Sequence, residues 1–96
     1  MSAPDTLELW LPHVGSSFTA GGDAQLRLEL VEASPLKPNG LPGRPPFSLV
    51  FEGDRDRGIL PQQIHELTHP ELGRRAIFIV PIGATATRVR YEAVFS

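Results

Sequence analysis

Apolar and polar residues alternate along most of residues 25–32, and this pattern constrains the fold more than any other feature of the chain. Leu26, Leu28 and Leu30 fall on one face of an extended segment, and the residues between them are polar. Because successive side chains of a β-strand point to opposite faces, the segment is predicted to be a strand with one face in a core and the other in water.

Three further segments extend the β pattern. Residues 47–52 and 89–95 alternate in the same way, whereas residues 76–80 are apolar at every position. An unbroken apolar run of this length predicts a central strand that is covered on both faces, with Phe78 in the core.

The expected strands are separated by turns and preceded by one helical pattern. Glycine-containing turns are expected at residues 20–23, 53–58 and 83–87. Asp5 is placed to cap a short helix that Pro12 limits and that buries Trp10 against one end or edge of the fold. We therefore predict a single all-β domain over residues 1–96, a small antiparallel barrel or sandwich of about five to six strands with a short N-terminal helix.

Composition bounds the classes of partner. With 9 Lys and Arg against 11 Asp and Glu, the formal net charge of −2 gives no basic field for nucleic acid or an anionic membrane. The absence of cysteine removes any Cys-ligated zinc site and fits a reducing compartment. No segment approaches the roughly 20 apolar residues of a membrane helix. A cytoplasmic protein without a cofactor, a nucleic-acid partner or a membrane partner is therefore expected.

One charged group of residues stands out. Acidic residues are interleaved with the arginines Arg55, Arg57, Arg74, Arg75, Arg88 and Arg90. Mixed signs at this spacing predict a solvated surface with salt bridges.

Residues 65–69 read His-Glu-Leu-Thr-His, which matches the H-E-x-x-H pattern of zinc metallopeptidases. The chemistry needs a helix, which brings His65 and His69 within about 6 Å of each other and leaves Glu66 to polarise the zinc-bound water. Pro70 follows directly and disfavours a helix at His69, and in a strand the two histidines would stand about 13 Å apart.

We therefore predict that this segment holds no metal and no catalytic residue. Residues 69–73 are instead expected to form a turn that packs Leu72 inward and uses a positive φ at Gly73. A small zinc-dependent hydrolase that uses His65 and His69 with Glu66 as base stays as an alternative.

Residues 33–46, ASPLKPNGLPGRPP, form a proline- and glycine-rich loop that is much longer than a hairpin needs. Prolines lower the entropy lost when such a loop is ordered against a partner. Leu36 and Leu41 would supply apolar anchors and Lys37 and Arg44 flanking charges, so these four residues are predicted to contact a protein partner. The alternative is a solvated spacer.

Several longer motifs span nearly the whole chain: LPHVGSSF, FSLVFEG, LPQQIHELTHPELG, IFIVPIG and YEAVF. Together they resemble an uncharacterised bacterial family of short domains of unknown function. The resemblance implies an interaction or assembly role, because members of that family often lie beside genes for phage-tail-collar or tail-fibre-like proteins. It implies no catalytic residues, and the family commonly has a different residue, often tyrosine, at the position of His65.

The sequence therefore favours a non-enzymatic protein–protein interaction or assembly module. The resemblance adds the expectation that it is accessory to a phage-tail-like or fibre-type assembly, in the cytoplasm or within a phage-like particle, with a tail- or fibre-like protein as partner. Besides the zinc hydrolase, a barrel that binds a small apolar ligand stays open. An internal cavity would favour it, since small barrels normally fill their interior with side chains. The sequence leaves the oligomeric state undefined.

Overall fold

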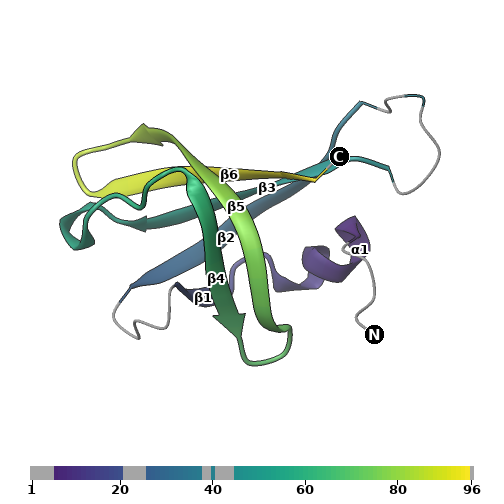
Figure 1. The fold of residues 1–96 in the computed structure, drawn as a ribbon, viewed down its shortest axis with the longest axis horizontal. Coiled ribbons are helices and arrows are strands. Elements are labelled where there is room, and N and C mark those ends of the chain that lie inside the picture. Colours follow the sequence, from purple (N-terminus) through teal and green to yellow (C-terminus); the bar gives the residue numbers. More distant parts are fainter. Residues whose placement is uncertain (1–5, 21–25, 38–39, 41–44, 96) are drawn as a thin grey trace.

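The computed structural model describes residues 6–20, 26–37, 40 and 45–95 (Figure 1). The chain begins with a short helix, α1 (Leu7–Trp10), and a 3₁₀ turn over Leu11–His13. The strands that follow are β1 (Ser17–Ala20), β2 (Arg27–Pro35), β3 (Phe47–Asp54), β4 (Gln63–His69), β5 (Gly73–Ala84) and β6 (Arg88–Phe95), with a second 3₁₀ turn, Arg55–Arg57, between β3 and β4.

The six described strands form a closed antiparallel barrel in the order β1-β2-β3-β6-β5-β4. Closure comes from β1 and β4, which pair at Thr19 with Thr68 and at Ala20 with Leu67. The predicted all-β class is confirmed, and the barrel is the form adopted. Among the described residues, no helix is long and apolar enough to cross a membrane.

Side chains from every strand fill the barrel interior. The alternation in β2 works as predicted, because Leu28 and Leu30 have no exposed surface. The predicted burial of Trp10 is also confirmed, and its ring packs against those of Phe18 and Phe95 at centroid distances of 5.8 and 6.1 Å. The N-terminal helix therefore contributes its one aromatic residue to the core cluster.

The prediction that residues 76–80 form a strand covered on both faces is wrong. Ile77 and Ile79 are buried, but Phe78 is 49% exposed. Its cross-strand partner Ile64 is 65% exposed. The physical reason is closure, since a barrel strand has one face toward the interior and one toward solvent, and none of the described residues forms a second layer over this part of β5.

The predicted turn over residues 69–73, which joins the end of the histidine motif to β5, is confirmed. β4 ends at His69, β5 begins at Gly73 with a φ of 72°, and Leu72 packs against the core. The helix cap expected at Asp5 and the turn expected after Ala20 lie outside the described residues.

The proline-rich loop is shorter than predicted, because β2 continues to Pro35 and β3 begins at Phe47. The backbone N–H of Leu36 donates to the carbonyl of Pro46 at 3.0 Å and closes the base of the loop. Figure 1 places this closed base, formed by Leu36 and Pro46, and the β5–β6 turn toward opposite ends of the longest axis.

Candidate functional site

The histidine motif lies in β4, so its backbone is extended as predicted and not helical. His65 and Glu66 lie on opposite faces of this strand. The Nε2 atom of His65 lies 2.9 Å from the carbonyl oxygen of Pro61, to which it can donate. The strand therefore separates the groups that a metallopeptidase helix would bring together.

His69 holds the β4–β5 turn through Nδ1 and is tied to the segment before β1 through Nε2. Its Nδ1 accepts the backbone N–H groups of Glu71 and Leu72 at 3.0 and 3.3 Å, which assigns the ring proton to Nε2. Nε2 then donates to Oγ of Ser16 at 3.1 Å, and the Ser16 hydroxyl donates to the carbonyl of His13. The imidazole is thus occupied as a turn-stabilising group.

The surroundings of His69 favour its neutral form. Burial lowers the pKa of His69 below its ordinary value, the nearby His13 lowers the pKa further, and Glu71 partly opposes both effects. The His13 ring meets the His69 ring edge-on at a centroid distance of 4.8 Å. Within the part of the chain that the structure describes, no group of three or more His, Cys, Asp or Glu side chains could hold a metal ion.

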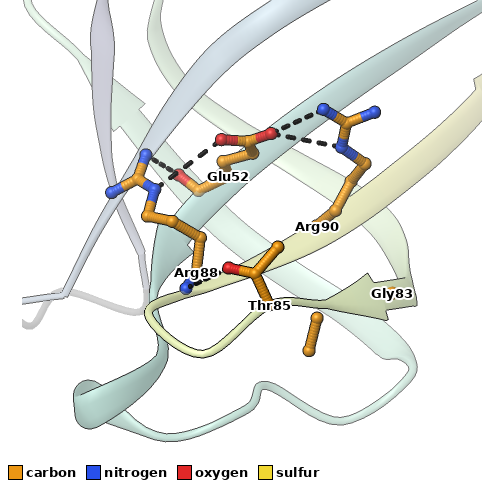
Figure 2. Close-up of a pocket in the computed structure, with 6 residues that line it drawn as sticks. Glu52, Gly83, Thr85, Arg88 and Arg90 are labelled. Carbon is orange, nitrogen blue, oxygen red and sulfur yellow. Dashed lines mark hydrogen bonds and ion pairs between the residues drawn. The ribbon is translucent and has the colours of Figure 1, made fainter.

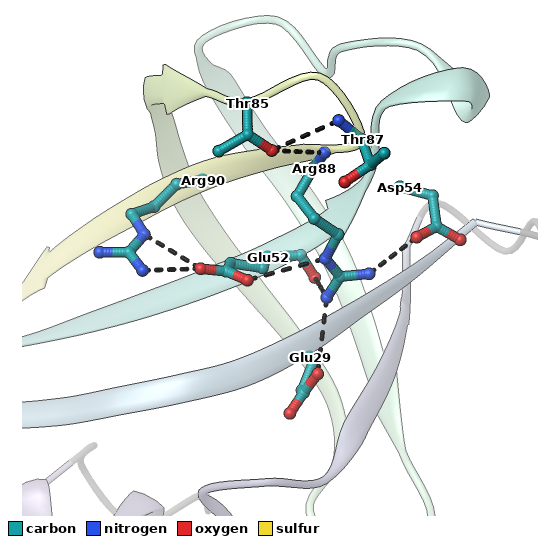
Figure 3. Close-up of polar contacts among 7 residues, drawn as sticks. All are labelled: Glu29, Glu52, Asp54, Thr85, Thr87, Arg88 and Arg90. Carbon is teal, nitrogen blue, oxygen red and sulfur yellow. Dashed lines mark hydrogen bonds and ion pairs between the residues drawn. The ribbon is translucent and has the colours of Figure 1, made fainter.

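A different group of polar residues surrounds a pocket on the outer face of the barrel. In the strand register, Glu52 of β3 lies opposite Arg90 of β6, and Arg90 lies opposite Gly83 of β5. Asp54 and Arg88 form the next outward-facing pair along the same two strands. Segments far apart in the sequence therefore place two arginines and two carboxylates side by side (Figure 3).

Arg88 is the centre of this network. Its guanidinium contacts three carboxylates, with Nη1 2.7 Å from Asp54 Oδ1, Nη2 3.5 Å from Glu29 Oε1 and Nε 3.6 Å from Glu52 Oε1. The hydrogen bond to Asp54 raises the pKa of Arg88, and the three carboxylate charges add to this effect against partial burial. Arg88 is therefore fully committed to groups of its own chain.

Arg90 is only partly committed. Its Nε and Nη2 atoms donate to one oxygen of Glu52, Oε2, at 3.2 and 2.7 Å. This hydrogen bond is the main reason why the pKa of Glu52 is lowered. Figure 2 shows the third guanidinium nitrogen of Arg90 on the side away from Glu52, and the Arg90 side chain is 54% exposed.

Thr85 fixes the β5–β6 turn beside these arginines. Its Oγ1 accepts the backbone N–H groups of Thr87 and Arg88 at 3.3 and 3.0 Å, which leaves the hydroxyl proton available to donate. Its carbonyl accepts a 2.7 Å hydrogen bond from Nη1 of Arg55. The turn is therefore held at both the side chain and the backbone of Thr85.

The resulting pocket has a volume of about 230 Å³ and is lined by Glu52, Gly83, Ala84, Thr85, Arg88 and Arg90 (Figure 2). A Cβ atom added to Gly83 would meet nothing within 4 Å. The position opposite Arg90 is thus empty of any side chain. Hydrogen-bond donors border this space, so the arrangement can bind a small polar or anionic group.

A second pocket of about 270 Å³ lies where α1 meets the base of the proline-rich loop. It is lined by Thr6, Leu7, Glu8, Pro35, Pro45 and Pro46. Of the predicted contact residues, Leu36 is 37% exposed and Lys37 is also exposed, whereas Leu41 and Arg44 lie outside the described residues.

Sequence reasoning predicted the salt-bridged surface but missed the pocket within it. The interleaved charges at Asp54, Arg88 and Arg90 indicated ion pairs, and these are present. The signal that could have found the pocket is Gly83, a residue without a side chain near the end of β5.

Fold and site define a small closed antiparallel barrel with a filled interior and a polar pocket on its outer face. The chain matches the family described as a domain of unknown function, DUF6916, over residues 6–95, and it belongs to that family. The expected membership of an uncharacterised domain family is confirmed. No curated protein and no solved structure matches the chain.

Proposed function

We propose that the protein is a non-enzymatic protein–protein interaction or assembly module. The observation that carries this proposal is the pair Ile64 and Phe78, which lie opposite each other on β4 and β5 and point outward. Adjacent large apolar side chains on an outer face are typical of contact surfaces.

The free energy available at this surface is substantial. Phe78 leaves about half of a side-chain area of ~200 Å² in water, so covering it would contribute roughly 2 to 3 kcal/mol at about 25 cal/mol per Å². Ile64 is exposed to a greater fraction than Phe78. Two such side chains at the centre of an interface are enough to act as its main anchors.

The architecture favours recognition by side chains. Closure of the barrel leaves no edge strand among the six described, so a partner has no unpaired strand to extend. The base of the proline-rich loop is a second contact region in this proposal, because Leu36 and Lys37 are exposed and the adjoining Pro35 lines the second pocket.

The resemblance of the sequence motifs suggests the setting. A tail- or fibre-like protein as partner, and a place in the cytoplasm or in a phage-like particle, are part of the proposal on that basis.

The proposal can be tested by crosslinking. A photoreactive phenylalanine analogue at position 78, introduced in the native host, should crosslink to a specific protein, and the same analogue at Val14 should not. Val14 is the matched control because it is also apolar and 42% exposed, but lies outside the barrel strands.

Affinity for the purified partner then provides the second measurement. Phe78→Ser combined with Ile64→Ser should weaken binding by about tenfold or more, while Val14→Ser leaves it unchanged. A chain that crosslinks to nothing at position 78, or a partner bound equally well by the double variant, would contradict the proposal.

A further inference from the structure

We propose that the pocket over Gly83 is a carboxylate-binding subsite that receives an acidic side chain of the protein partner. The inference rests on the proposed function and names the chemistry of one contact within it. It is carried by the open donors of Arg90 and Thr85 and by the space left by Gly83.

The donors suit a carboxylate. In the guanidinium of Arg90, Nε and Nη2 both donate to one oxygen of Glu52, and the hydrogens of the third nitrogen can donate to another acceptor. The Thr85 hydroxyl, which already accepts two backbone N–H groups, has a proton to donate. Charge-assisted hydrogen bonds from arginine to carboxylate are among the strongest that side chains make.

Arg90 sets the sign of the ligand. Asp54, Glu29 and Glu52 neutralise Arg88, so Arg90 is the cation of the lining that keeps donor hydrogens for a further anion. A neighbouring pocket of about 350 Å³ is bordered by Asp54 and Asp56. That neighbour repels the same carboxylate, which restricts its binding to the Gly83 side.

An exposed apolar residue precedes Gly83 in the chain. The β5–β6 register shifts between Pro81 and Gly83, and the bulged residue Ile82 is 48% exposed. A bulge of this kind re-aims a side chain locally. The partner segment that fits therefore carries an acidic residue next to an apolar one.

The test uses peptides of stated composition as probes. Acetylated and amidated peptides with a central Leu-Asp pair are added to the ¹⁵N-labelled full chain, and peptides with Leu-Asn in its place serve as the neutral control. The Leu-Asp peptides should shift the amide signals of Gly83 and Thr85 and the Nε signal of Arg90 at millimolar concentration, and the Leu-Asn peptides should bind about tenfold more weakly.

Two pairs of variants localise the effect. Gly83→Val fills the pocket and should abolish the shifts, whereas Ala76→Val places the same side chain at an exposed position of the same strand and should not. Arg90→Gln should lower the affinity for the Leu-Asp peptides about tenfold. Arg74→Gln removes the same charge from an exposed position of β5 and should leave the affinity unchanged.

A third variant has the opposite expected sign. Glu52→Gln removes the internal competitor for Arg90 and should strengthen binding of the Leu-Asp peptides several-fold, a result that a purely structural role of the network would not produce. If Gly83→Val does not fold, the Arg90 and Glu52 variants still decide the question.

Three outcomes would overturn the subsite: equal binding of Leu-Asp and Leu-Asn peptides, shifts that persist in Arg90→Gln, or affinity that falls in Glu52→Gln. They leave the proposed function standing if crosslinking at position 78 succeeds. A missing crosslink together with Leu-Asp binding would instead reject the proposed surface at Phe78 and retain the subsite.

Discussion

Two glycines on different barrel strands should respond differently to the same substitution. Gly53 in β3 and Gly83 in β5 both lie within strands, and neither has a positive φ. A Cβ atom on Gly53 would lie 2.8 Å from Cδ2 of Leu28 and 3.3 Å from the carbonyl oxygen of Arg27. The same atom on Gly83 would meet nothing within 4 Å. The difference between the two sites is therefore steric and not conformational.

The expected magnitude follows from the packing around each site. Leu28 has no exposed surface and belongs to the filled core, so it cannot move aside without displacing its neighbours. Gly53→Ala should thus destabilise the fold by about 1 to 3 kcal/mol, as overpacking does in other cores. Gly83→Ala should stay within about 0.5 kcal/mol of the unchanged chain, since its methyl group enters open space.

Urea unfolding followed by circular dichroism measures the free energy of unfolding of both variants. In thermal unfolding of a domain of this size, each kcal/mol lost should lower the melting temperature by roughly 4 to 8 °C, so the Gly53→Ala shift is easily resolved. Equal stability of the two variants would refute the reasoning, because it would show either that Leu28 yields freely or that β2 and β3 do not approach as closely as the structure has them.

Three further changes test other parts of the structure. Burial lowers the pKa of His69 in the folded state, so its contribution to stability should be fully present above its unfolded pKa of about 6.5 and be lost as the pH falls through the folded pKa. In urea unfolding at pH 7.5 and pH 5, the stability of a His69→Gln variant should therefore depend less on pH than that of the unchanged chain. Ile79→Ala should destabilise the fold by about 2 to 5 kcal/mol and Phe78→Ala by less than about 2, as thermal unfolding can measure. The opposite ranking would show that Phe78, and not Ile79, faces the barrel interior. Arg88→Gln should lower the free energy of unfolding by about 1 kcal/mol at low salt and by less in 1 M NaCl, and a loss that does not change with salt would rule out an electrostatic origin.

The candidate site was predictable only in its chemistry. Interleaved acidic and basic residues indicated ion pairs, but nothing in the order of residues showed that Arg90 would lie between Glu52 and Gly83. Those three residues come from three strands, and their alignment depends on the register of β3, β6 and β5. A shift of that register by one residue would turn Arg90 to the interior and close the pocket.

The sequence by itself determined the local structure. Alternation at Leu28 and Leu30 specified a half-buried strand, and Pro70 with Gly73 specified a turn where the bare histidine motif suggested a helix. These features depend on dihedral preferences and on a side-chain period of two residues, which act over a few neighbouring positions.

Only the tertiary structure decided which apolar faces are covered. Residues 76–80 are apolar on both sides, and their composition is the same whether a second layer packs on them or water does. The pairing of β1 with β4 closed the barrel, enclosed Ile77 and Ile79, and left Phe78 outside. Closure joins segments that are nearly fifty residues apart, so its outcome depends on the combined packing of all the strands and is not written in the pattern of any one of them.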